Sequence, residues 1–97
     1  MEIELTVIIK AKPEFREEVA AALQNMVRES HKEEACLQYD LHQGRDDQDV
    51  FIFHERWQSQ AGLDVHNEKP YIKAFQTLAA DKLAEKPVLH FTKKWEA

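Results

Sequence analysis

The sequence predicts an α+β domain of the ferredoxin-like kind, in which the element order β-α-β-β-α-β places two helices on one face of a four-stranded antiparallel sheet. Apolar residues alternate with a period of two in four segments, as in half-buried strands. In two longer segments they recur with the helical period of 3.6. The order of these segments along the chain is that of two split β-α-β units.

The first strand and the first helix are expected in residues 2–34. Residues 2–10 place Ile3, Leu5, Val7 and Ile9 on one face, which predicts a strand with one buried side. Residues 12–34 then change to a helical stripe that includes Phe15, Val19, Met26 and Val27. Pro13 suits the first turn of that helix, because proline needs no amide donor there.

A hairpin is expected in residues 36–57. Residues 36–44 alternate, and after the polar turn at 45–49 comes the apolar and aromatic run of residues 50–57. In this second strand Phe51, Phe53, Glu55 and Trp57 share one face. The opposite face is also partly apolar, which predicts that both sides of the sheet are covered.

A broken helix and a final strand complete the pattern. Ser59 is a good N-cap for a short helix, and Pro70 suits the start of a second helical run, so the helix is expected to break near 68–70. Residues 88–95 alternate again and predict the fourth strand. The chain is too short to divide, so residues 1–97 form one domain.

The helix-free face of the sheet would be left open in a monomer. Ile8, Ile52 and Val88 are predicted to lie on it. A small domain also gains much from a subunit interface, because it buries a modest fraction of its surface alone. The sequence therefore predicts a homodimer that packs across this face.

Composition excludes several classes of partner. Thirteen Lys and Arg against eighteen Asp and Glu give a formal charge of −5, so nucleic acid is not an expected partner. A single cysteine, Cys36, the absence of an apolar run of membrane-spanning length and the absence of a leader pattern fit a soluble cytoplasmic protein. The histidines show no metal-binding spacing and glycine-rich phosphate loops are absent, so no metal and no cofactor is expected.

Three segments resemble one known family. "CLQYDLHQ", "FHERWQS" and "LDVHNEKPYIKAF" are similar, in order and spacing, to segments of the antibiotic biosynthesis monooxygenase domain family. This resemblance implies a dimeric α/β barrel with a cavity between sheet and helices in each subunit. Several such proteins oxygenate quinols and polycyclic phenols with O₂, without flavin or metal. Glu55, Trp57, His66 and Phe75 match the positions that the family pattern specifies.

The chain also departs from subgroups of that family. Tyr71 stands where many members have a second histidine, and Phe53 and Thr77 replace an asparagine and an arginine of polyketide oxygenases. His66 and Gln76 replace a tryptophan and an iron-ligating histidine of haem-degrading relatives. A haem-degrading role is therefore not expected.

The predicted site is built around one base. A phenol has a pKa of about 10, so it reacts poorly with O₂ until a base removes its proton. His66 is the natural base at neutral pH. Glu55 is a candidate to orient the imidazole or to hold its charged form, and Trp57 is a candidate for an aromatic wall. The other predicted substrate-binding residues are aromatic: Tyr39, Phe51, Phe53, Tyr71 and Phe75.

Each of these residues has a structural alternative. His66 could cap a helix, Glu55 could form a buried structural pair, and Trp57 could serve the core alone. The leading prediction is a cofactor-independent monooxygenase that oxidises a quinol-like or other electron-rich aromatic ring. The alternatives are a dimeric small-molecule binding or sensing module, since fold does not fix function, and an isomerase of small carbonyl compounds.

Overall fold

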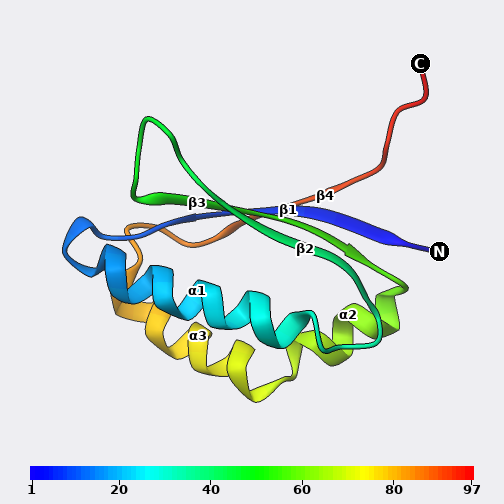
Figure 1. Ribbon diagram of the computed structural model, residues 1–97, viewed down its shortest axis with the longest axis horizontal. Helices are drawn as coiled ribbons and strands as arrows, with labels where there is room; N and C mark the ends of the chain where they lie inside the picture. Colours follow the sequence, from blue (N-terminus) through cyan, green and yellow to red (C-terminus); the bar gives the residue numbers. More distant parts are fainter.

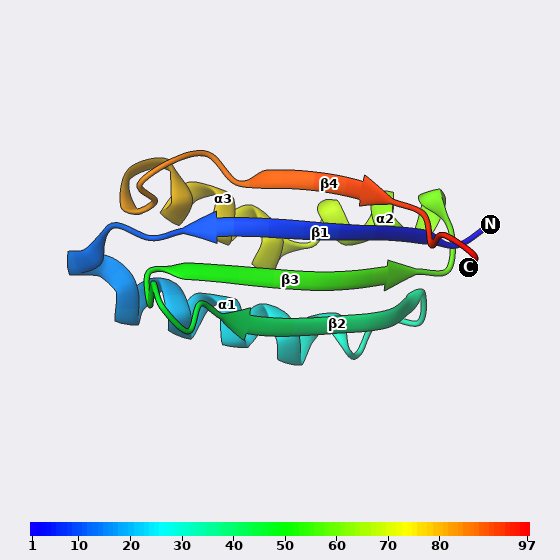
Figure 2. The ribbon, with the colours of Figure 1, turned by 90° about the horizontal axis from the view of Figure 1, so that it is seen from above.

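The fold class predicted from the sequence is confirmed. The computed structural model describes residues 1–97 and contains strands β1 (Ile3–Lys10), β2 (Cys36–Gln43), β3 (Val50–Trp57) and β4 (Val88–Thr92), with helices α1 (Arg16–Ser30), α2 (Gln60–Asn67) and α3 (Pro70–Lys82). The strands form one sheet in the order β2-β3-β1-β4, and every neighbouring pair is antiparallel. Figure 1 shows all three helices on one side of this sheet, and Figure 2 shows the strand order from above.

The first helix begins later and ends earlier than its sequence pattern. Pro13–Phe15 form a single 3-10 turn, and α1 starts at Arg16. After Ser30 the chain makes turns in which the amide of Glu33 donates to the carbonyl of Ser30. These turns place Glu33 in the connection between α1 and β2, close to the layer of helices.

The predicted break in the second helical region is present between α2 and α3. Ser59 caps α2 by accepting a hydrogen bond from the amide of Gly62 at 3.1 Å, and Pro70 is the first residue of α3. A Cβ atom on Gly62 would lie 2.5 Å from that of Ala35. The missing side chain therefore lets α2 approach the α1–β2 connection, and this approach brings His66 towards Glu33.

The core lies between the sheet and the helices. It consists of fifteen buried apolar residues, supplied by the inner faces of β1, β2 and β3 and by the facing sides of the helices. Three polar residues, Ser30, Glu55 and His66, are buried with them. Because buried polar groups are costly unless they are paired, these three residues mark the region where a functional site is expected.

The last strand is shorter than predicted and poorly covered. It ends at Thr92 rather than Trp95, and the following residues leave the sheet (Figure 1), with Trp95 87% exposed. Leu89 and Phe91 pair with the buried Val7 and Leu5, yet they are 51% and 60% exposed. The helices therefore cover β1 and β3 but leave the β4 edge open. No helix combines the length and apolarity that crossing a bilayer requires.

Candidate active site

His66 is the buried histidine at the end of α2. It is 3% exposed. Its ring centroid lies 4.3 Å from that of Trp57 and 5.5 Å from that of Tyr39. Tyr39 in turn stacks on Phe53 at 4.6 Å. The imidazole therefore belongs to an aromatic cluster that joins the sheet to α2, and its ring is held in one place by packing.

The acidic partner of His66 is Glu33, not Glu55. The imidazole Nδ1 lies 2.7 Å from Oε2 of Glu33, and their side chains are only 4% and 9% exposed. Tyr71 donates its hydroxyl proton to the same Oε2, and its oxygen lies 3.0 Å from Oγ of Ser30. The expectation that Glu55 orients the imidazole is therefore wrong. Glu33 does so from the α1–β2 connection, and the sequence reasoning did not identify it.

Glu55 has a different partner. Its Oε1 accepts a hydrogen bond from Nε1 of Trp57 at 2.9 Å, within the same strand. Burial raises the pKa of Glu55 to about 7, although the hydrogen bond from Trp57 opposes that rise. A carboxyl group with this pKa exchanges its proton near neutral pH, so it can act there as an acid or as a hydrogen-bond donor.

The imidazole of His66 is neutral at neutral pH. Burial lowers its pKa, and the hydrogen bond to Glu33 opposes the fall. A carboxylate accepts hydrogen bonds only, so Nδ1 carries the proton and Nε2 holds the free lone pair. No hydrogen bond is formed by Nε2, and no fully enclosed side-chain nitrogen or oxygen lacks a partner. Nε2 is therefore open to the adjacent cavity, where it can accept a proton.

That cavity has a volume of about 510 Å³ and lies between the sheet and helices α2 and α3. Fourteen of its twenty-one lining residues are apolar, and its size suits a small aromatic ligand. Glu55 and His66 contribute polar groups to the lining, while Glu85 and Lys86 lie where the chain passes from α3 to β4. It is a mostly apolar pocket, open along β4, with two titratable groups in its wall.

The predicted aromatic residues divide into two sets. Tyr39, Phe53 and Phe75 line the cavity. Phe51 is buried beneath α1 and borders a different hollow with Arg16, and Tyr71 lies on the far side of Glu33. Trp57 is fully buried behind the imidazole and does not line the cavity, so it supports His66 and Glu55.

The remaining reactive side chains form no second centre. No group of three or more His, Cys, Asp and Glu side chains could hold a metal ion. His42 and His54 meet across the hairpin, with ring centroids 5.2 Å apart. Burial and the negative charge of Glu33 raise the pKa of Cys36 to about 11, which keeps its thiol protonated.

Comparison with known proteins shows the family and agrees with the fold. The family model described as antibiotic biosynthesis monooxygenase matches residues 3–78. The chain belongs to this family. Within it, the chain is 37% identical to YcnE of Bacillus subtilis over 73 residues, which are 75% of this chain and 77% of YcnE.

Two further comparisons are informative. The chain is 34% identical to sll1783 of Synechocystis over 77 residues, which are 79% of this chain but 52% of sll1783, so it spans about half the length of that protein. The crystal structure of PA3566 from Pseudomonas aeruginosa superposes with a TM-score of 0.92 at 28% identity and covers 98% of this chain and 95% of PA3566.

Proposed function

We propose that this protein is a cofactor-independent monooxygenase that oxidises a quinol-like or other electron-rich aromatic small molecule with O₂. The observation that carries the proposal is the free Nε2 of His66, which faces an apolar cavity while Nδ1 is held by Glu33. YcnE of Bacillus subtilis and Rv0793 of Mycobacterium tuberculosis, which is 29% identical over 72 residues, are both named as candidate monooxygenases. The family is consistent with this reaction class.

The first chemical step that the site supports is proton removal. A phenolic hydroxyl has a pKa of about 10, so it stays protonated in water at neutral pH. Nε2 of His66 accepts this proton, and the carboxylate of Glu33 stabilises the imidazolium that forms. The resulting substrate anion is rich in electrons and reacts with O₂ more readily than the neutral ring does.

The apolar walls of the cavity and one acidic group support the later steps. Tyr39, Phe53 and Phe75 provide flat apolar walls for a ring. Such walls exclude water, which lengthens the life of an anion or peroxy species. Protonated Glu55 donates a hydrogen bond to a substrate oxygen, and its pKa of about 7 makes this form available at neutral pH.

The direct test is O₂ uptake with a menadiol-type quinol. We expect protein-dependent O₂ consumption above the autoxidation of the quinol alone, measured with an oxygen electrode and a heat-denatured protein control. Ligand-induced stabilisation against melting without O₂ consumption would instead favour a binding or sensing module. Interconversion of a small hydroxycarbonyl compound without O₂ consumption would favour an isomerase.

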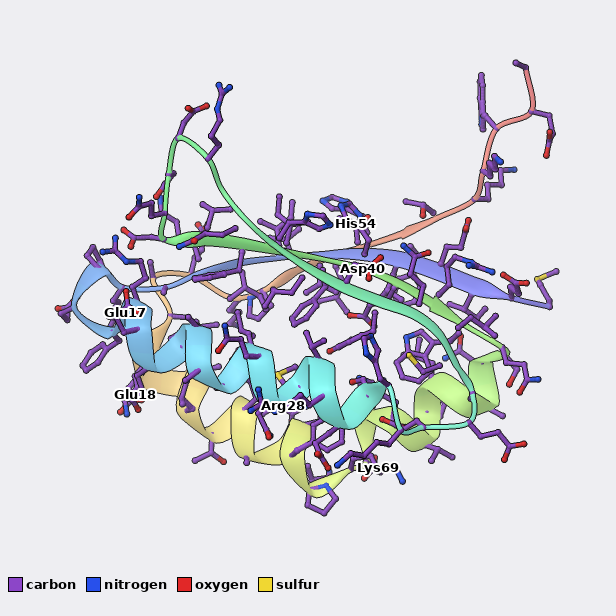
Figure 3. The ribbon with its side chains drawn as sticks, viewed as in Figure 1. Glu17, Glu18, Arg28, Asp40, His54 and Lys69 are labelled. Carbon is purple, nitrogen blue, oxygen red and sulfur yellow. The ribbon has the colours of Figure 1, made fainter.

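We also propose that the active form is a homodimer that packs across the bare sheet face. Ile52, Ile8 and Val88 form one continuous row across β3, β1 and β4 on that face, and Val88 is 43% exposed. Figure 3 shows His54 on the same side, away from the helices. An exposed apolar row on a helix-free sheet is typical of an interface.

The proposed dimer is tested by measuring the molecular mass in solution. Light scattering at low micromolar concentration should give twice the 11.4 kDa of the chain. The variant Ile52→Glu should be monomeric at the same concentration, because it places a charge in the apolar row. A monomeric wild-type protein would contradict the proposal.

A further inference from the structure

Two hollows lie on opposite sides of the hydrogen bond between Glu33 and His66. The inner one is the apolar cavity, whose wall includes His66. The outer one is a surface groove of about 480 Å³, whose wall includes Glu33, Tyr71, Lys32 and Lys69. The two hollows share no lining residue. The bond from Nδ1 of His66 to Oε2 of Glu33 is therefore a direct polar connection between them.

The groove is polar, in contrast to the cavity. Three of its nine lining residues are hydrophobic, and it is bordered by charged side chains from α1, from the α1–β2 connection and from the start of α3. Lys69 lies on the helix side of the molecule, at the junction of α2 and α3 (Figure 3). Water and small anions can therefore reach the edge of Glu33, whereas the cavity on the other side is largely apolar.

The hydrogen bonds around Glu33 fit a group that exchanges protons. Its Oε2 receives the hydroxyl of Tyr71 as well as Nδ1–H of His66. Tyr71 also contacts Ser30 at 3.0 Å and Nδ1 at 3.3 Å. A carboxylate that only fixed the ring would need no contact beyond its hydrogen bond with Nδ1. Glu33 also borders the groove.

We propose that Glu33 carries protons between His66 and the water of the surface groove, so that the imidazole exchanges protons with solvent through Nδ1 while a substrate occupies the cavity. The inference rests on the proposed function for the source of the proton. One proton passes from the substrate hydroxyl to Nε2, and one passes from Nδ1 to Glu33, which releases it to the groove. In the reverse direction Nε2 gives its proton to the oxygen that the substrate anion has reduced, and Nδ1 regains one from Glu33, so the pair returns to its starting state.

The proposal is tested by chemical rescue. Glu33→Ala should lower kcat on the order of 10²-fold while KM changes little, because Glu33 does not line the cavity. Formate should restore much of kcat in a concentration-dependent manner, because it can enter the vacated position from the groove. Glu34→Ala is the matched control: Glu34 borders the same groove without contacting His66, and this variant should keep wild-type kcat with or without formate.

A second variant separates proton transfer from positioning. In Glu33→Gln the amide oxygen can still accept Nδ1–H and hold the ring, but the amide cannot carry a proton. We expect kcat to fall as in Glu33→Ala, with no response to formate because the position is filled. Wild-type kcat in Glu33→Gln, or no formate response in a folded Glu33→Ala protein, would overturn the relay.

A measurement that does not require turnover tests the relay separately from the proposed function. If wild-type protein does not oxidise quinols, the function fails, and the relay is then judged by NMR titration of His66. The pKa of His66 should fall in Glu33→Ala and rise again with formate, since Glu33 opposes its lowering. A pKa of His66 that does not respond to formate would contradict contact between the groove and the imidazole.

Discussion

Replacement of His66 by alanine is expected to lower kcat for quinol oxidation by about 10²- to 10⁴-fold, the usual contribution of a general base. The imidazole supplies the free Nε2 in the cavity, and neither neighbour can replace it. Glu33 lies behind the ring on the Nδ1 side, and Glu55 is engaged by Trp57. Oxygen-electrode kinetics at saturating quinol measure this loss directly.

Two controls make the result specific to proton transfer. His66→Gln keeps a side chain of similar size in the aromatic cluster, so it should lose activity to a similar degree while the fold is kept. Glu14→Gln changes an exposed side chain of the 3-10 turn, which lines neither the cavity nor the groove and lies off the bare sheet face, so it should leave kcat unchanged. Turnover in His66→Ala equal to that of wild type would remove the imidazole from the mechanism.

The fold could be predicted because its determinants are local. Alternation in residues 2–10 and 50–57 and the helical stripe of α1 are properties of neighbouring residues, and the strand order follows from connection rules. The ends were less predictable. The fourth strand stops at Thr92, which pairs with Glu4, because β1 begins at Ile3 and offers little further backbone for pairing; a sequence pattern alone does not report where the partner strand ends.

The site was predicted only in part, because its key contact is not local. Glu33 and His66 are 33 residues apart, and Glu33 lies in the α1–β2 connection whereas His66 lies in α2. The close approach that joins them depends on Gly62 lying against Ala35. A glycine in a short helix was the one available signal, and by itself it does not identify a carboxylate partner.

The aromatic residues illustrate a second limit. Alternation correctly put Phe51 on the same strand face as Phe53 and Glu55. Alternation could not show that Phe51 lies under α1, at the far end of the strand from Trp57 and His66. Whether a strand residue reaches the cavity depends on where the helices cross the sheet. Tyr71 likewise follows Pro70 in α3 but faces the groove.

Glu55 should make the folded state less stable as the pH rises from about 4.3 to about 7. Its pKa in an unfolded chain is about 4.3, whereas burial raises it to about 7 in the folded protein. The folded state binds the proton of Glu55 more tightly than the unfolded state does. The stabilisation from this proton is therefore complete below the unfolded-state pKa and is lost as the pH rises through the folded-state pKa. The full difference corresponds to about 4 kcal/mol of unfolding free energy.

The variant Glu55→Gln isolates this effect, because an amide does not titrate and its oxygen can still accept the hydrogen bond from Trp57. His66 acts in the opposite direction, since its lowered pKa makes stability rise with pH up to about 6.5, but it does so in both proteins. Urea unfolding at several pH values should therefore show the variant gaining on wild type by up to about 3 kcal/mol between pH 4 and 8. Parallel curves would mean that the pKa of Glu55 is the same in the folded and the unfolded state. Glu55 would then be ionised at neutral pH and could not donate to a substrate oxygen.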